Sequence, residues 1–273
     1  MEETKKKKHK AGRIILLVIL LLIAAIAALI CYHSTRNTKE MHAVIAGGLE
    51  TVGEFEKVTP LDAGEYTDIK MNGIMKFHVD QYEVEDFGNL SVMTTNMGFM
   101  QMATFTLTPF EKNAPLCTFD YMYIMGNRKS YAEFYDLAAD PEREEYTAVI
   151  ESLREMSARY SDLEDVPYEG NWYDNLLPVF LHKKLPAKEE QRNRELFNDA
   201  LTTYMTAVSA LPQNSPEEET VQLENTKAYS DGLIEKGGVS TDVFKQALGE
   251  ETTRDFFDTT FFGTALYADP AQS

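Results

Sequence analysis

The stretch PLCTFDYMYIMGNRKSYAEFYDL, Pro115 to Leu137, decides the fold of this chain. Two runs rich in aromatic and apolar residues, Leu116–Met125 and Ser130–Leu137, lie on either side of the turn formers Gly126 and Asn127. Apolar runs of this length around a tight turn predict a β-hairpin.

One acid, Asp120, interrupts the apolar run of the first predicted strand. An unpaired charge that is buried in a sheet costs free energy, and the usual outcome is a raised pKa and a protonated carboxyl. A protonated acid on a sheet face can donate a proton. Asp120 is therefore the candidate catalytic residue.

The residues before the hairpin predict three more strands. These segments are bounded by turn signals such as Asn72-Gly73 and Gly88-Asn89, and they are Gly73–Val84, Leu90–Thr95 and Phe99–Thr108. Together with the hairpin they predict a five-strand antiparallel meander.

The residues after the hairpin predict helices. Asp140-Pro141-Glu142 is typical of a helix start, and the helix is expected to run to about Tyr160. Further helices are expected from Pro186 through Val208, after the capping-box sequence Ser215–Glu218, over Val239–Leu248 and over Glu250–Tyr267. Strands followed by helices predict an α+β domain with the helices packed on the sheet.

The N-terminus predicts a membrane anchor. Six Lys and Arg residues lie within residues 1–13, and Ile14–Tyr32 then runs for nineteen residues without a charge. At 1.5 Å per residue this segment spans about 28 Å, enough for the core of a bilayer. The positive-inside rule places residues 1–13 in the cytoplasm as a basic tail and the main domain outside, in a single-pass membrane protein. A cleaved signal peptide is the alternative, since Ala24-Ala25 and Ala27-Ala28 offer small residues near the end of the segment.

The predicted organisation continues with residues 33–60, a polar stalk at Ser34–Glu40 and a lead-in helix at Met41–Val58, followed by a domain over residues 61–273. The first 34 residues hold six basic and two acidic side chains, which leaves 20 basic and 42 acidic residues and a net charge near −22. Such a domain repels nucleic acid and anionic lipid headgroups. Nucleic acid is therefore not expected as a partner.

Several kinds of site find no support in the sequence. Cys31 and Cys117 are the only cysteines, and Cys31 lies at the predicted membrane segment, so no disulfide is expected within the domain. The five His residues show no metal-ligand spacing, and no metal is expected. Neither a phosphate-binding glycine loop nor a Ser or Cys triad motif is present.

Methionines and aromatic residues are concentrated on the predicted strands. The methionines either fill a core or line a pocket for a large apolar ligand, and they are Met93, Met97, Met100, Met102, Met122 and Met125. The hairpin aromatics are either strand formers or a surface that flanks a flat conjugated ligand, and they are Phe119, Tyr121, Tyr123, Tyr131, Phe134 and Tyr135.

Two patches of the sequence resemble the ferredoxin-dependent bilin reductases. One is Pro115–Leu137, with its PL…D start and EFYDL end. The other is C-terminal: Tyr229-Ser230-Asp231, then Gly237-Gly238-Val239, then RDFFDTTFFG at Arg254–Gly263. The resemblance implies a three-layer α/β/α sandwich with a central antiparallel sheet.

The resemblance also implies a reaction. The strand acid of that family, the proton donor to a linear tetrapyrrole, falls on Asp120. Single electrons would arrive from an external donor, a reduced iron–sulfur protein such as ferredoxin, and the protein itself would bind no cofactor. Some members carry a His on the strand before the acid, and the corresponding place here, near Ala103, has none. No second carboxylate can be assigned in Ile234–Gly237.

The carboxylates of a bilin require cationic partners. The compact basic residues of the domain are Arg128-Lys129 at the hairpin tip and the run His182-Lys183-Lys184. Both are expected to be solvated surface and are left out of the candidate site.

The sequence thus favours a membrane-anchored, oxidoreductase-like domain that binds or reduces a linear tetrapyrrole, with protonation by Asp120. The alternative is a non-catalytic extracytoplasmic binding or scaffold domain of a bacterial cell envelope. A cleft between the sheet and the late helices, with Asp120 facing into it, would favour the first. A filled sheet face with Asp120 bonded to backbone would favour the second.

Overall fold

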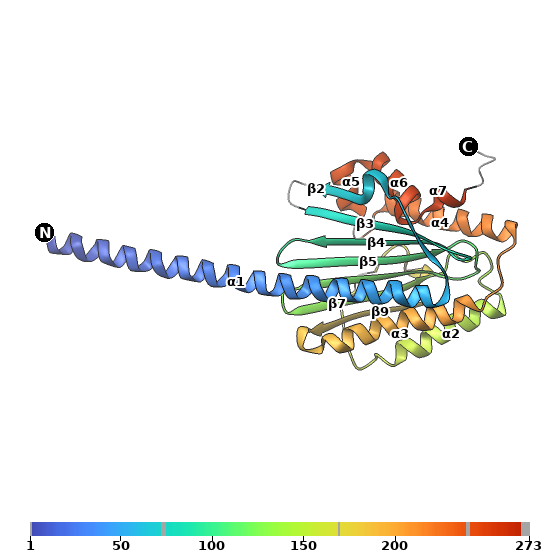
Figure 1. The fold of residues 1–273 in the computed structure, drawn as a ribbon, viewed down its shortest axis with the longest axis horizontal. Helices are drawn as coiled ribbons and strands as arrows, with labels where there is room; N and C mark the ends of the chain where they lie inside the picture. Colours follow the sequence, from blue (N-terminus) through green and yellow to red (C-terminus); the bar gives the residue numbers. More distant parts are fainter. Residues whose placement is uncertain (1, 72–74, 169, 239–240, 269–273) are drawn as a thin grey trace.

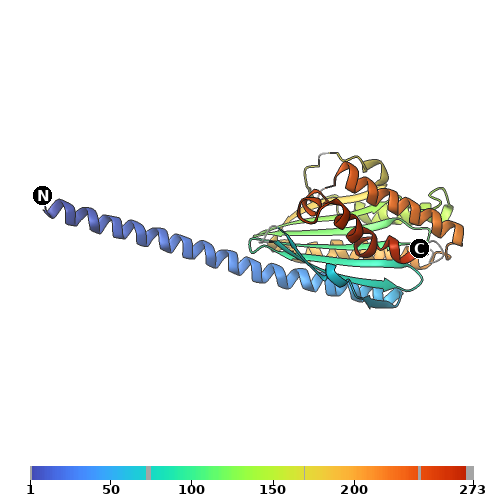
Figure 2. The same ribbon diagram turned by 90° about the horizontal axis from the view of Figure 1, so that it is seen from above.

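The computed structural model describes residues 2–71, 75–168, 170–238 and 241–268, with side chains from residue 13 onward. A nine-strand antiparallel sheet lies between two helical layers (Figures 1 and 2). One layer contains α1, α2 and α3, and the other contains α4 to α7. The predicted α+β fold, an α/β/α sandwich with a central antiparallel sheet, is confirmed.

The strands follow the order β1-β3-β4-β5-β6-β7-β9-β8 in the sheet, and β2 pairs with β3 beside β1. Their bounds are β1 Val58–Leu61, β2 Asp68–Met71, β3 Met75–Val84, β4 Gly88–Asn96, β5 Met100–Pro109, β6 Leu116–Ile124, β7 Asn127–Tyr135, β8 Glu164–Asp165 and β9 Val179–Pro186. The five predicted strands are β3 to β7, which form the predicted meander; the expected start at Gly73 lies outside the described residues.

Four strands are not foreseen by the sequence patterns, and β9 matters most among them. It pairs with β7 from Asn127↔Pro186 to Phe134↔Val179, so it extends the sheet beyond the hairpin. The predicted helix from Pro186 through Val208 is present, but its start differs by a few residues: Pro186 ends β9, a 3₁₀ turn at Ala187–Glu189 follows, and α3 begins at Glu190.

The helices are α1 Glu2–Phe55, α2 Glu144–Ala158, α3 Glu190–Ser209, α4 Pro216–Lys236, α5 Thr241–Leu248, α6 Glu250–Phe256 and α7 Thr264–Tyr267, with short 3₁₀ turns at Gly64–Thr67, Asp174–Leu176 and Ala187–Glu189. The capping box at Ser215 is confirmed, since Glu218 N donates to Ser215 Oγ and Ser215 N donates to Glu218 Oε2. The predicted start of α2 at Asp140-Pro141 is wrong by several residues, because Arg143 is the N-cap.

The predicted helix Glu250–Tyr267 is broken into two. A π-helical turn at Phe257–Phe261 follows α6, and Gly263 then adopts a left-handed φ of 74° before α7. A Cβ at Gly263 would lie 2.6 Å from Asn89 Cγ. The chain therefore turns at this glycine because the helical layer touches β4 there.

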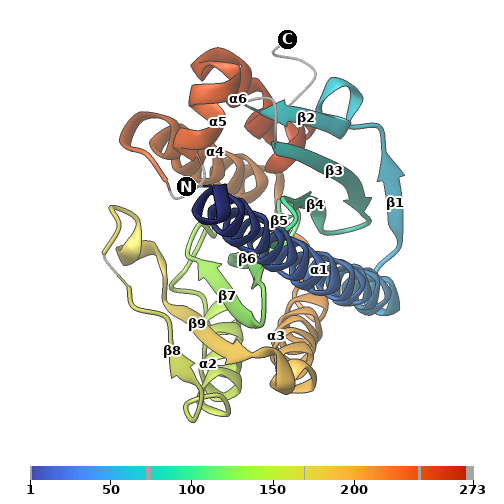
Figure 3. The same cartoon turned by 90° about the vertical axis from the view of Figure 1, so that its left-hand side faces the viewer.

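Helix α1 is continuous from Glu2 to Phe55, and Figure 3 shows it almost end-on. The predicted stalk at Ser34–Glu40 is wrong: these residues are helical, and Asn37 is buried against the turn between β6 and β7, where its Nδ2 donates to Met125 O at 3.1 Å. The polar side chains that resemble a linker instead bond to the ends of strands. By length and composition, α1 is apolar enough to cross a membrane, and its apolar window is not buried in the protein.

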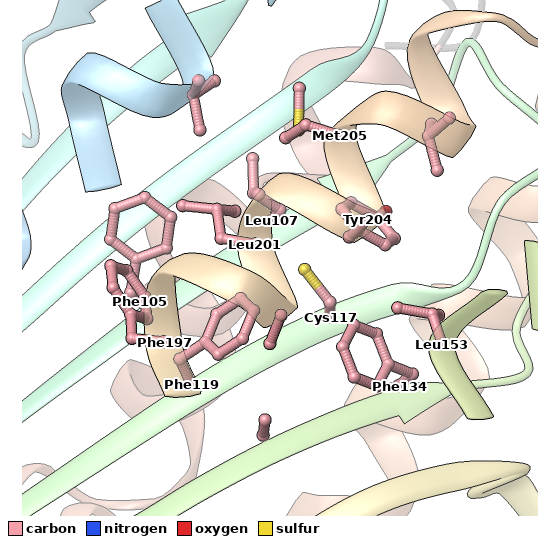
Figure 4. Close-up of a cluster of buried hydrophobic side chains, with 14 of the residues drawn as sticks. Phe105, Leu107, Cys117, Phe119, Phe134, Leu153, Phe197, Leu201, Tyr204 and Met205 are labelled. Atoms are coloured by element: carbon pink, nitrogen blue, oxygen red, sulfur yellow. The ribbon is translucent and has the colours of Figure 1, made fainter. Parts of the chain in front are cut away.

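Alternation along the strands separates the two faces of the sheet. The face toward α1, α2 and α3 is a closed core in which Phe105, Phe119 and Phe197 meet edge to face (Figure 4). Cys117 is buried in the same layer, beside Tyr204. The opposite face carries the site.

Candidate functional site

A cavity of about 540 Å³ lies between the sheet and the C-terminal helices. Strands β4 to β7 and β9 supply its floor, and α4, α5, α6, the π-helical turn and the segment before β9 supply its walls. Its lining residues are Met93, Met102, Thr104, Thr106, Leu116, Thr118, Asp120, Met122, Tyr131, Glu133, Tyr135, Val166, Pro167, Tyr168, Asn171, Tyr173, His182, Tyr229, Leu233, Gly238, Thr241, Phe244, Phe256, Phe257, Phe261 and Phe262.

Asp120 faces this cavity from the middle of β6. The register places Thr104 of β5 directly opposite Asp120 on one side and Tyr131 of β7 on the other, and His182 of β9 lies opposite Tyr131. Directly opposite side chains on one face of a sheet are close neighbours. The four residues therefore form a polar row across the floor of an otherwise apolar cavity.

The surroundings of Asp120 raise its pKa to about 7. Loss of solvent is the largest cause, because removal of water disfavours the charged form. The Thr104 hydroxyl donates to Asp120 Oδ1 at 2.5 Å and lowers the pKa, the charge of Glu133 raises it, and His182 lowers it. A carboxyl with this pKa is substantially protonated at neutral pH, which is the condition for a proton donor.

A second polar cluster lies beside the row. Glu133 of β7 lies with its Oε1 2.7 Å from His182 Nε2, and its Oε2 accepts from the Tyr135 hydroxyl at 2.5 Å. The His182 side chain is 5% exposed and also packs against the rings of Tyr131 and Tyr168. The cavity thus contains two acids in different settings, one bonded to a hydroxyl and the other paired with an imidazole.

The expectation that the compact basic residues are solvated surface is wrong for three of them. Arg128 is buried on the opposite face of the sheet, where its Nε donates to Glu190 Oε2 at 2.6 Å. Lys183 is buried on that face too and pairs with Asp165, whereas His182 lines the cavity. Successive residues of β9 point to opposite faces of the sheet, which explains why His182 faces the cavity and Lys183 the other side. This difference can be predicted only if His182–Lys184 is recognised as part of a strand.

Alternation also divides the methionines and aromatic residues. Met93, Met102, Met122, Tyr131 and Tyr135 line the cavity. By contrast, the side chains of Phe119, Tyr121, Tyr123 and Phe134 belong to the closed core on the other face. Most aromatic residues of the cavity wall lie outside the hairpin, to which the expectation of a ligand-flanking surface is limited. They are Tyr168, Tyr173, Phe244, Phe256, Phe257, Phe261 and Phe262.

The described lining includes no Lys and no Arg. Across the described part of the chain, no group of three His, Cys, Asp or Glu residues has the spacing to hold a metal ion. The two cavity acids and one imidazole are therefore the ionisable groups other than tyrosine that a ligand would meet in the described lining.

No protein-family model matches the chain, and comparison with curated proteins finds no match. Among solved structures, phytochromobilin synthase from tomato in complex with biliverdin matches with a TM-score of 0.68. The alignment covers 84% of this chain and 85% of that one, at 13% sequence identity. The chain has the fold of that enzyme. At this identity the likeness is one of fold, and it extends over the sheet and both helical layers rather than over a local motif.

Proposed function

We propose that the domain binds a linear tetrapyrrole in the cavity and reduces it by stepwise transfer of electrons and protons, with Asp120 as a proton donor. The observation that carries the proposal is the placement of Asp120: a carboxyl with a pKa of about 7 on the floor of a cavity of ligand size. The tomato enzyme of the same fold was crystallised with biliverdin.

The chemistry follows from the charge that each step creates. An external one-electron donor, such as ferredoxin or another iron–sulfur protein, is oxidised, and the bound tetrapyrrole becomes a radical anion. The neutral Asp120 carboxyl then transfers its proton to that radical and becomes a carboxylate. Two electrons and two protons reduce one double bond, and Asp120 regains its proton from solvent between steps. His182, paired with Glu133, is placed to hold a further proton near the ligand.

The apolar and aromatic lining suits a flat conjugated ligand. Because no Lys or Arg is among the described lining residues, we expect the ligand carboxylates to lie toward the open side of the cavity, where water solvates them. The rival scaffold function would leave the sheet face filled and Asp120 bonded to backbone. Here Asp120 bonds to a side chain and faces the cavity.

The test uses the full chain in lipid nanodiscs, with empty nanodiscs as the blank. Biliverdin is expected to change its absorption spectrum on mixing and to raise the melting temperature of the protein. An unchanged spectrum together with an unchanged melting temperature would refute the proposal.

The role of Asp120 has a separate test. Asp120→Asn is expected to keep binding but to slow reduction by a strong chemical reductant at least about 100-fold, since general acid catalysis typically contributes that much. Asp80→Asn, which changes an exposed acid on β3, is the matched control and should behave as the unmodified protein. Equal rates for both variants would remove Asp120 from the mechanism.

We also propose that α1 crosses the cell membrane once, with the N-terminus in the cytoplasm and the domain outside. Support comes from the apolar helix and the basic residues that precede it. A reporter fused to the C-terminus tests the side. Activity of a reporter that functions only in the cytoplasm would reverse this orientation and bring soluble iron–sulfur donors within reach.

A further inference from the structure

The end of the domain from which α1 emerges carries an apolar loop. Residues Met97, Gly98 and Phe99 connect β4 to β5, and Met100 begins β5. These four residues carry no charge, and Phe99 is 51% exposed. Figure 1 shows that this turn lies at the end of the sheet where α1 leaves the domain.

The loop lies beside the apolar segment of α1 rather than beyond it. Every described side chain from Arg13 to Leu29 is exposed, and contact with the domain begins at Ile30. A Cβ built on Gly98 would lie 3.8 Å from Ile30 Cγ2. Ile30 is the third residue from the end of the apolar segment Ile14–Tyr32, which places it about 3 Å inside that end along the helix axis.

A network of hydrogen bonds holds the loop in this position. Gln101 Nε2, on a buried side chain, donates to Asn96 Oδ1 at 2.9 Å and to Gly98 O at 2.8 Å. Asn96 Nδ2 donates to Thr38 Oγ1 of α1 at 3.0 Å, and Phe99 O accepts from Met125 N at 3.1 Å. The loop is therefore tied both to α1 and to the neighbouring turn, so its position along the helix is fixed.

These distances have a consequence for a membrane. The apolar segment spans about 28 Å, against a hydrocarbon core of about 30 Å. If α1 crosses a bilayer, Ile30 lies close to the boundary of the hydrocarbon, and the loop beside Ile30 reaches the same depth. No flexible spacer separates the two, because α1 is one continuous helix. Apolar side chains such as Phe and Leu on a surface at that depth bury into the boundary between headgroups and acyl chains.

We propose that the β4–β5 loop is a membrane contact of this domain: Phe99 inserts into the phospholipid bilayer that α1 spans, and the loop and helix together fix the orientation of the domain on its surface. The proposal rests on α1 as a spanning helix and is independent of any bound tetrapyrrole. It also does not depend on which side of the membrane the domain occupies.

The test measures depth with fluorescence. The full chain is placed in nanodiscs of a zwitterionic phospholipid brominated either near the headgroup end or near the far end of its acyl chains. Phe99→Trp is compared with Phe180→Trp, which alters a Phe that is 47% exposed. Phe180 lies opposite Glu133, six residues along β7 from the turn at Asn127, so it is about 20 Å farther from that end of the sheet. The signal of the native Trp172 is measured in the unmodified protein and subtracted.

A third variant, Leu20→Trp, reports on the helix itself. We expect the fluorescence of Phe99→Trp to be quenched most by bromine near the headgroup, that of Leu20→Trp to be quenched most by deep bromine, and that of Phe180→Trp to be quenched by neither. Quenching at position 20 with none at position 99 would overturn the loop contact. Absence of quenching at position 20 would overturn the spanning helix, and the loop contact with it.

Discussion

The pKa of a single carboxyl, Asp120, is raised mainly because the fold removes water from around it. It bonds to one hydroxyl, that of Thr104, and lies half-buried on the floor of a cavity whose walls are largely apolar and aromatic. Glu133, two strand positions from the residue opposite Asp120, has both of its oxygens paired, with His182 and with Tyr135. Two acids on one sheet face thus have different hydrogen-bond partners, and the proposed function uses this difference by assigning the proton donation to Asp120.

The raised pKa of Asp120 predicts a pH-dependent loss of stability. The carboxyl ionises near pH 3.8 when unfolded and near 7 when folded, so between these values the folded state binds more protons. The free energy of unfolding therefore falls as pH rises through this window, by up to about 1.4 kcal/mol per pH unit, and levels off above pH 7. Asp120→Asn removes the titrating carboxyl and with it this pH-dependent loss of stability. We expect the variant to gain about 2.6 kcal/mol over the unmodified protein between pH 5 and pH 8 in denaturant unfolding. A difference that does not vary with pH would show that Asp120 titrates normally.

Burial raises the pKa of Asp120, whereas the hydrogen bond from the Thr104 hydroxyl lowers it. This hydrogen bond stabilises the carboxylate, so Thr104→Val should raise the pKa of Asp120 by about one unit, as expected for a bond to a charged group. The titration can be followed by the infrared band of the protonated carboxyl, identified by its absence in Asp120→Asn. Thr106→Val is the matched control, because Thr106 bonds to Thr118 on the same face. Equal midpoints in the two variants would contradict the assigned role of Thr104.

At the scale of elements, the sequence predicts those helices and strands whose formation depends on neighbouring residues in the chain. The hairpin at Pro115–Leu137 follows from its turn residues and apolar strands, and Ser215 caps α4 as its capping box requires. The central acid of the site follows as well, because a carboxyl within an apolar strand is visible in the sequence alone.

The missed parts depend on tertiary contacts. Strand β9 is not foreseen, because its core face includes Lys183, whose ammonium reaches Asp165, and a basic run of this kind resembles surface. Its recognition would have placed His182 on the cavity face. The break in the last helix depends on the approach of Gly263 to Asn89, which is far away in the sequence. Such contacts leave no local signal.

The packing of α1 on α3 predicts opposite effects at two adjacent glycines. A Cβ at Gly48 would lie 2.7 Å from Phe197 Cζ, whereas a Cβ at Gly47 meets nothing within 4 Å. Gly47→Ala should stabilise the protein by up to about 1 kcal/mol through helix propensity. Gly48→Ala should destabilise it by about 1–3 kcal/mol, because Phe197 is held in the closed core. Thermal unfolding of the pair measures the difference, and a shared gain in stability would show that α1 and α3 are not in close contact.

At the scale of the whole molecule, α1 is one continuous helix. The sequence alone divides the same residues into an anchor, a stalk and a lead-in helix. Its apolar part from Ile14 to Leu29 is exposed, and its second half is part of the helical layer that covers the sheet. If the apolar part of α1 spans a membrane as we propose, this continuous helix transmits its orientation to the domain and its cavity. The domain is also strongly acidic, so a basic electron donor would approach it faster than an acidic one at low ionic strength, and salt would reduce the difference.

The double role of α1 predicts how much of it can be removed. A chain that begins at residue 35 loses the apolar segment but keeps Met41, Val44 and Val52, which are buried against α3 and the sheet. A chain that begins at residue 57 loses all three. Burial of each such side chain contributes about 1.5–3 kcal/mol, so the loss of three is comparable to the whole stability of a typical domain. We expect residues 35–273 to unfold cooperatively on heating, as followed by near-ultraviolet circular dichroism, and residues 57–273 to lack a fixed tertiary signal and to aggregate. Comparable melting of the two chains would show that the second half of α1 only rests on the domain, and a domain that folds without it would have no rigid link to the membrane.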